Sequence, residues 1–546
     1  MIGLFPHLAA SVRREPLTEV ASPAAARHTP AMLHERGRVY RFSHQRPWQR
    51  GAALLATALV TLVAATTPAS TSAQSPATPT MAATPIPGVP SPGAAGIGDP
   101  YFPLLGNGGY DAVHYTIDLD LDVEAGAIRD ATTTIDAVAT QELSMFNLDF
   151  RGPKIDVVAV DGVPADWTRD GGELTITPAR PLPAGELFQT EVRYHGTPDI
   201  DEEDRFERGW WTTSSSVFAV GEPAGSDVWY PVNGHPRDKA TYTLAITVPE
   251  PYDVVSNGLL ASVARSTGAA GNPSTITYTW DNQEPTASYL VMFHAAELDV
   301  TLDEGPGGIT LIEAFPPDVP DQETLLFEQV PEMIEVFTER FGPYPFASLG
   351  STVFADTSFN AALETQGMIG YDRSAVSERT IAHEVAHQWF GNSVSPARWQ
   401  DMWLNEGFAR YSEVLWAEAA HGSRAANAAL QRQIASLATA SRTESGEGVL
   451  IGDPGPDRLF TEVVYAGGAV VMHELRQRLG DEAFFRLLQE WAVRYRYSTV
   501  TTDDFVALAE EVSGQDLDAF FTDWLYTPWT PDRVADRFPL AGTPIP

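Results

Sequence analysis

Two histidines and a glutamate stand close together in the stretch IAHEVAHQWFG. On a helix, His383 and His387 are one turn apart, so both imidazoles project from one face and can bind the same metal ion, with Glu384 beside them. A catalytic zinc site needs a third protein ligand and leaves the fourth position to water. The segment WLNEGFARYSEV supplies a carboxylate, because Glu406 follows His387 by 19 residues, far enough for the chain to turn and return. The spacing therefore predicts a zinc site formed by His383, His387 and Glu406.

The residue types define the chemistry of such a site. Zinc held by two neutral imidazoles and one carboxylate lowers the pKa of a bound water towards about 7 and polarises a scissile carbonyl. Glu384 is adjacent to the ligands without being one, so it can accept the water's proton and return it to the leaving amine. A simpler interpretation makes the histidines ordinary core or surface groups. The flanking glutamate and the second carboxylate on a following helix favour the metal.

These segments resemble a known family. HEVAHQWFG followed by WLNEGFA is similar, almost letter for letter, to the zinc signature of the gluzincin aminopeptidases of the aminopeptidase N type, and the similarity extends from Tyr101 to about Pro531. The resemblance implies that His383, His387 and Glu406 are the ligands of one Zn²⁺ per chain.

A downstream tyrosine also takes its expected role from this resemblance. The segment VVYAGGAVVMHEL is similar to the family segment that carries the transition-state tyrosine, which implies that Tyr465 stabilises the developing oxyanion. From its neighbours Val463 and Val464 alone, a core position would be the better interpretation of this residue.

Two further glutamates concern the substrate's amine. AALETQ stands where the family has a glycine-alanine-methionine-glutamate-asparagine motif, which implies that Glu364 holds the free amine, although Leu363 and Thr365 replace the usual methionine and asparagine. In AVGEPAGSDVWYP, Glu222 matches a β-domain glutamate that also meets the amine. A free α-amine has a pKa near 8 and is costly to bury unpaired. Two carboxylates would compensate its charge and favour an exopeptidase.

Composition limits the alternatives. The chain has 546 residues, 43% of them hydrophobic, so two or three globular domains are expected. Its formal net charge of −37 disfavours nucleic acid and anionic membrane surfaces as partners. Because it contains no cysteine, thiolate metal sites, thiol nucleophiles and disulfides are excluded.

The N-terminal region has the pattern of a targeting segment. Residues 1–50 carry eight arginines and three glutamates, and an apolar run, GAALLATALVTLVAA, follows. This run has the length of a signal peptide's hydrophobic region and is short for a membrane span. We expect cleavage after Ala73 and export to the cell envelope or the medium, with an uncleaved N-terminal anchor as the alternative. Met32 is an alternative start to Met1.

The period of the hydrophobic pattern changes along the chain. Up to about residue 303, segments such as HYTIDLDLDV, TYTLAITV and TITYTW alternate apolar and polar residues, as strands do. Beyond that point helical spacing prevails, and Pro331 should kink or split the first helix. We expect helices over 321–341, 377–390, 406–420, 463–479 and 481–495.

The expected fold is therefore multidomain α+β. An antiparallel, β-sandwich-like domain over 99–303 precedes a thermolysin-like, α-rich catalytic domain over 304–546. An N-terminal extension and signal peptide over 1–73 and a linker rich in Pro, Ala and Thr over 74–98 come first. Because the chain ends at Pro546, we expect no long C-terminal helical domain and a more open cleft.

Three functions remain open at this point. The first is a secreted zinc aminopeptidase acting on peptides with a free N-terminus, and Glu364 is the feature that favours it. The second is a zinc endopeptidase with an open cleft, and the third is a non-catalytic peptide-binding protein. We expect no nucleic acid partner and no stable membrane insertion of the mature chain. The sequence determines neither the oligomeric state nor the preferred N-terminal residue.

Overall fold

The computed structural model describes residues 88–198, 208–268, 273–354, 359–443 and 448–538. The predicted signal peptide and residues 74–87 of the predicted linker lie outside these ranges. Among the helices described, none combines the length and the apolar character needed to cross a bilayer.

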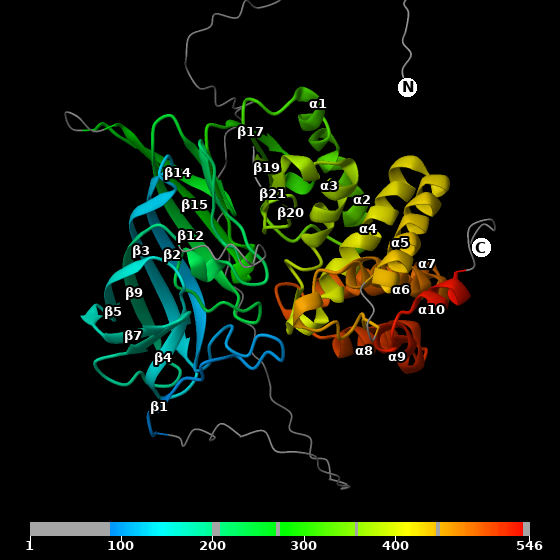
Figure 1. Cartoon of the computed structure of the whole chain (residues 1–546), viewed down its shortest axis with the longest axis horizontal. Coiled ribbons are helices and arrows are strands. Elements are labelled where there is room, and N and C mark those ends of the chain that lie inside the picture. The colour runs from blue at the N-terminus through cyan, green and yellow to red at the C-terminus, as the bar shows by residue number, and fades with distance from the viewer. Residues whose placement is uncertain (1–87, 199–207, 269–272, 355–358, 444–447, 539–546) are drawn as a thin grey trace, which may run out of the picture. The chain divides into compact units, whose positions relative to one another are not determined.

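One large sheet dominates the first half of the described chain (Figure 1). Its strand pairs are antiparallel except for β2 and β12, which run parallel, so the expectation of a wholly antiparallel domain was wrong in this detail. Side chains alternate with a period of two in both parallel and antiparallel strands, so the sequence pattern could not distinguish the two kinds of pairing. In spatial order the strands are β14 (Leu259–Ser266), β15 (Thr275–Thr286), β12 (Ala240–Pro249), β2 (Tyr110–Asp122), β3 (Ala127–Ala139), β9 (Leu187–Gly196), β5 (Lys154–Val160) and β6 (Val163–Pro164).

Strand β2 shows how the alternating pattern becomes a face. Its polar alternates lie on the wetter side, where Asp120 and Asp122 lie 3.4 and 3.2 Å from the guanidinium of Arg129. These carboxylates thus form surface ion pairs on the strand. The buried alternates are Tyr115, Ile117, Leu119, Leu121 and Val123.

Two smaller sheets accompany the large one in the described region. Ser91 and Pro92 pair with β4, so part of the predicted linker is held in a sheet. Loop residues after β11 carry Glu222 towards the cavity described below. The strands are β1 (Ser91–Pro92), β4 (Leu143–Asp149), β8 (Glu173–Thr177) and β7 (Asp166–Asp170) in one sheet, and β10 (Trp211–Thr212), β11 (Ser216–Ala219), β16 (Phe293–Ala296) and β13 (Asp253–Ser256) in the other.

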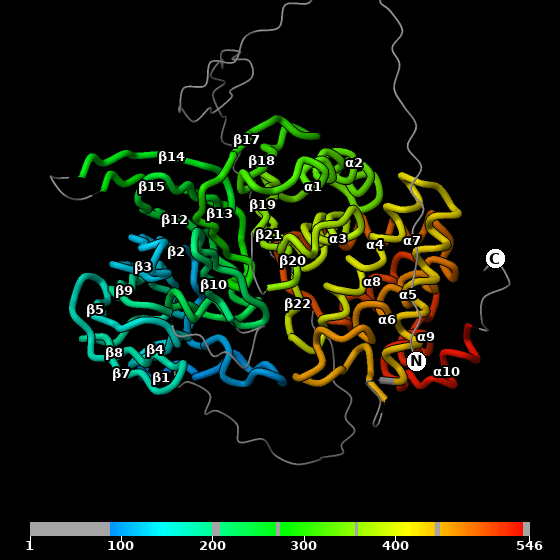
Figure 2. Tube along the Cα trace, turned by 45° about the horizontal axis from the view of Figure 1, so that its top comes forward, coloured from blue at the N-terminus to red at the C-terminus, as the bar shows by residue number. Residues whose placement is uncertain are grey.

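A mixed sheet lies beside helix α3 (Glu378–His387), as Figure 2 shows. Its first strand, β17, spans the expected domain boundary between residues 303 and 304. The position of that boundary stays a prediction. Strand β20 contains Leu363 and ends just before Glu364. In spatial order the strands are β17 (Asp299–Glu304), β18 (Thr310–Phe315), β19 (Ser348–Phe354), β21 (Met368–Asp372) and β20 (Ala362–Leu363).

Helices dominate the second half of the described chain (Figure 1). The expected split of the first helix is confirmed, because Pro331 lies in the first turn of α2. Helix α5 was not predicted, although its apolar residues recur at helical spacing. The other helices are α1 (Asp321–Thr324), α2 (Val330–Phe341), α4 (Trp403–His421), α5 (Ser423–Thr443), α6 (Glu462–Leu479), α7 (Asp481–Arg494), α8 (Thr502–Ser513), α9 (Asp518–Tyr526) and α10 (Pro531–Arg537), and strands β22 (Ser395–Pro396) and β23 (Thr499–Val500) pair between them.

Local interactions fix both ends of α3. At its start, the Ser377 hydroxyl accepts a hydrogen bond of 3.1 Å from the Thr380 amide, the usual N-cap arrangement. Past its end, Gly391 has a φ of 116°. A Cβ at Gly391 would lie 2.0 Å from Oδ1 of Asn405, so only glycine lets the chain pass this close to α4.

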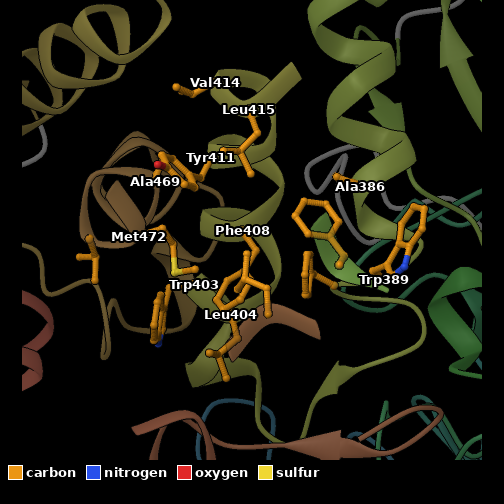
Figure 3. Close-up of a cluster of buried hydrophobic side chains, with 14 of the residues drawn as sticks. Ala386, Trp389, Trp403, Leu404, Phe408, Tyr411, Val414, Leu415, Ala469 and Met472 are labelled. Carbon is orange, nitrogen blue, oxygen red and sulfur yellow. The ribbon is translucent and has the colours of Figure 1, made fainter. Parts of the chain in front are cut away.

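Helices α3, α4 and α6 share a hydrophobic core. Figure 3 shows Phe408 and Trp403 of α4 within this cluster, with Trp389 following α3 and Met472 contributed by α6. Where α4 and α6 cross, a Cβ added to Gly407 would lie 2.8 Å from the Cα of Gly468. The two backbones therefore touch one residue after Glu406 and three residues after Tyr465.

We expect Gly407→Ala to destabilise the protein although alanine favours helices, because the new methyl group meets backbone and forces α4 and α6 apart, at a cost of about 1–3 kcal/mol. Gly467→Ala is the matched control, since its Cβ would meet the flexible end of Ile451 at 2.8 Å. Thermal or urea unfolding measures both. Equal stability of the two variants would contradict the close crossing.

Candidate active site

One cavity of about 590 Å³ collects every candidate site residue. Its walls come from α3, α4, α6, strand β20 and the loop after β11. The candidate residues in its lining are Glu222, Glu364, His383, Glu384, His387, Glu406 and Tyr465.

The three candidate metal ligands form a small triangle. Nε2 of His383 lies 3.0 Å from Nε2 of His387 and 3.2 Å from Oε2 of Glu406, and Nε2 of His387 lies 3.4 Å from the same oxygen. A tetrahedral zinc with bonds of about 2.0–2.2 Å holds its ligands roughly 3.3 Å apart. The donor set and its spacing therefore fit Zn²⁺.

The second ring nitrogen of each imidazole, Nδ1, also lies close to a polar group. Nδ1 of His387 lies 2.7 Å from Oδ1 of Asn405 and 3.0 Å from the Phe390 carbonyl oxygen. Nδ1 of His383 lies 3.2 Å from Oε1 of Glu413, an ion-pair distance without hydrogen-bond geometry. Such contacts fix the orientation of metal-binding histidines.

Charge and burial set the proton affinities of these groups. Burial alone would raise the pKa of Glu406, but His387 and His383 lower it overall. Burial alone would lower the pKa of both histidines, whereas the surrounding carboxylates raise it. Metal binding must therefore displace protons from the imidazoles, which makes metal affinity pH-dependent.

Glu384 lies on the same helix with its carboxylate near His387 and Glu364. Burial, with help from the Glu364 and Glu406 charges, raises its pKa to about 7. A nearby divalent cation opposes this shift because it favours the charged form. The carboxyl group can thus exchange a proton near neutral pH, as a general base must.

Tyr465 approaches the triangle from α6. Its hydroxyl donates a hydrogen bond of 2.8 Å to Oε1 of Glu406, and its ring is nearly parallel to that of His383. Burial, followed by the Glu406 charge, raises its pKa well above the usual value, so the phenol keeps its proton. The side chain is therefore a hydrogen-bond donor at the cavity.

The two remaining glutamates lie on the His387 side of the cavity. Oε1 of Glu364 is 3.7 Å from Nδ1 of His387 and accepts a hydrogen bond of 3.3 Å from Asn405. Oε1 of Glu222 is buried and has no hydrogen-bond partner among the described residues. Burial, then the Glu364 charge, raises the pKa of Glu222 well above its usual range. A cation bound here would give the buried Glu222 oxygen a partner and would stabilise the charged form of this carboxyl group.

Several supporting residues escaped the sequence analysis. Glu413 lies seven residues after Glu406, two turns along the same helix face, and that spacing could have revealed it. Asn405 is the immediate neighbour of Glu406, but only the fold shows its contact with His387. Gln388 and Asn392 donate hydrogen bonds of 3.0 and 2.7 Å to the Glu364 carbonyl oxygen.

A family model described as the peptidase family M1 domain matches residues 326–524. The region that contains the ligand triangle therefore matches the M1 peptidase domain. The chain's relatives include human glutamyl aminopeptidase, 26% identical over 56% of this chain and 34% of that protein. Aminopeptidase N of Streptomyces lividans is 27% identical over 76% of this chain and 50% of that protein. The chain thus spans a third to a half of the length of these relatives.

Solved structures give a fuller match. The M1 zinc metallopeptidase of Deinococcus radiodurans superposes with a TM-score of 0.70 at 27% identity, over 79% of this chain and 97% of that one. A variant of that enzyme bound to a Tyr-Ser-Ala substrate superposes with a TM-score of 0.71. The match to the M1 domain and these zinc metallopeptidase structures indicate Zn²⁺ as the cofactor, in agreement with the ligand triangle.

We expect Glu406→Gln to lose zinc and Glu384→Gln to keep it, because Glu406 faces both imidazoles whereas Glu384 is the proton acceptor. Glu384→Gln should lose at least about 10²-fold in turnover. Metal analysis and the hydrolysis of aminoacyl anilides measure the two effects, with the exposed Glu335→Gln of α2 as the control. Equal zinc loss in both site variants would contradict these roles.

Proposed function

We propose that this chain is a zinc aminopeptidase that removes N-terminal residues from peptides. The observation that carries the proposal is the pair of buried carboxylates, Glu222 and Glu364, in the same cavity as the ligand triangle. A peptide's terminal ammonium placed between them would neutralise charge that is otherwise costly to bury. The scissile bond of the first residue would then lie over the metal ligands.

Each side chain receives a role from its position. His383, His387 and Glu406 hold zinc, which when bound supplies Lewis acidity towards water and the scissile carbonyl. Glu384 accepts a proton from the attacking water and delivers it to the leaving amine. The Tyr465 hydroxyl, now directed at Glu406, donates to the oxygen that gains negative charge. Glu222 and Glu364 orient the amine.

Relatives support this function. The matches include glutamyl aminopeptidases and aminopeptidases N, and a variant of the D. radiodurans enzyme has been crystallised with a Tyr-Ser-Ala substrate. Variants of a two-domain M1 zinc metallopeptidase bound to L-arginine and to L-tryptophan also match. Those ligands carry a free amine, the group that Glu222 and Glu364 would bind here. An endopeptidase would not need a buried pair of carboxylates beside the metal.

Two finer features belong to the same proposal. The sheets over 99–303 would form the β-sandwich-like domain and residues 304–546 the thermolysin-like domain of such an enzyme. The arginine-rich start and the apolar run after it support export, with cleavage after Ala73. N-terminal sequencing of the mature protein should find Gln74 at or near the start. Material that still carries residues 51–65 would instead support an anchored form.

We expect Glu364→Gln to lower kcat/KM for substrates with a free amine by about 10²-fold or more, because a desolvated charge pair is worth about 2–5 kcal/mol. The glutamine keeps the side chain's shape, so the loss reports charge. Hydrolysis of an N-acetylated substrate should be slow in the wild type and unchanged in the variant. Exposed Glu335→Gln serves as the control. If the wild type cleaves acetylated and free peptides comparably, the endopeptidase interpretation replaces the aminopeptidase proposal. If the protein binds zinc and cleaves neither kind of peptide, only the peptide-binding interpretation remains.

A further inference from the structure

The charges lining the cavity are unevenly distributed. Glu222 and Glu364 lie on the side of His387, whereas the arginines in the described lining, Arg379 and Arg410, lie on the side of His383 through their contacts with Glu413. A peptide bound across the zinc ligands would therefore meet carboxylates at one end, and at the other the two arginines with the buried Glu413 carboxylate that contacts both.

The two arginines differ in their availability. Arg410 is largely buried, and its guanidinium lies 2.9 Å from Glu462 and 3.4 Å from Glu413. Arg379 is 53% exposed at its side chain, and its nearest carboxylate oxygen, on Glu413, is 3.7 Å away. Among the described residues it makes no hydrogen bond. Its five donors therefore remain largely available to a bound molecule.

Helix α3 orders these groups along the cavity. Arg379, His383 and His387 follow one another at intervals of four residues, so they share one face and are spaced about 6 Å apart along the helix axis. Glu364 lies beside the last of them. The face thus runs from the half-exposed Arg379 guanidinium, past the two metal-binding imidazoles, to the amine-binding carboxylate.

This order fixes the direction of a substrate, provided that the proposed function holds. With the amine at Glu364 and the scissile carbonyl at the zinc ligands, the second residue points towards Arg379. Successive Cα atoms are about 3.8 Å apart, so a second-residue side chain or a nearby C-terminal carboxylate can cover roughly one helix turn.

We infer that Arg379 binds a carboxylate on the C-terminal side of the scissile bond, so that the enzyme prefers peptides with an acidic second residue or short peptides with a free C-terminus. Both sources offer the same planar anion, which a guanidinium binds through paired N–H donors. Because Arg379 is half exposed, we expect a preference of about 3- to 5-fold, which weakens as salt screens the pair.

Matched peptides separate the two sources. Let X be the N-terminal residue that the enzyme accepts best as an anilide. The first comparison measures kcat/KM for X-Glu-Ala amide and X-Gln-Ala amide. The second measures kcat/KM for X-Gln-Ala as the free acid and as the amide. The first ratio reports an acidic second residue and the second reports the terminal carboxylate. Each ratio is taken within one protein, so a general loss of activity cancels.

Variants assign the preference to the side chain. Arg379→Gln should bring the favoured ratio close to one, and Arg379→Lys should retain part of it. Arg424→Gln, which removes an exposed arginine at the start of α5, should leave both activity and ratios unchanged. Ratios near one in the wild type, or ratios that survive Arg379→Gln, would overturn the inference.

Peptide binding keeps this test independent of turnover. If the zinc-loaded protein hydrolyses no anilide, the proposed function fails, and the same ratios are then measured as dissociation constants by calorimetry. A carboxylate preference that depends on Arg379 would still support the inference, and its absence would overturn it.

Discussion

The active site is built around the cost of burying several carboxylates in one cavity. Glu406 and Glu413 offset this cost through the histidines, Tyr465 and arginines that surround them. Glu222 has no such compensation at its Oε1 among the described residues. A buried anion that lacks a partner is destabilising unless a ligand supplies one. Zinc would supply one such cation, and under the proposed function a substrate ammonium would supply the other.

Close contacts between helices hold the buried carboxylates near their partners. Gly407 and Gly468 let α4 and α6 touch, which keeps Glu406 within hydrogen-bond distance of Tyr465. Gly391 lets the chain after α3 pass Asn405, which orients His387. Larger residues at these positions would separate groups whose interactions depend on tenths of an ångström.

The large sheet also supports the site. Lys239 directly precedes β12. It donates hydrogen bonds of 2.8 and 3.0 Å to the carbonyl oxygens of Asn392 and Ser393, in the segment after α3. Asn392 in turn holds the main chain at Glu364. The same half of the chain contributes Glu222 to the cavity. The proposed amine recognition would therefore depend on segments from both halves of the described chain.

The sequence by itself determined the part of the site that local geometry controls. The helix period places His383, Glu384 and His387 together wherever the helix lies, and alternation identified the main strands. It missed α5, although the apolar residues of this helix recur at helical spacing, and the parallel pairing of β2 with β12. Resemblance to a family indicated Tyr465, Glu364 and Glu222.

Only the tertiary structure decided which distant residues meet, because such contacts depend on how helices and sheets pack. Glu222 and Glu364 are brought to one cavity from separate sheets, and Asn405 and Lys239 acquire their roles through contacts that no local spacing encodes. Arg379 follows the same rule: the sequence places it one helix turn before His383, but its exposure and its distance from other charges come from packing.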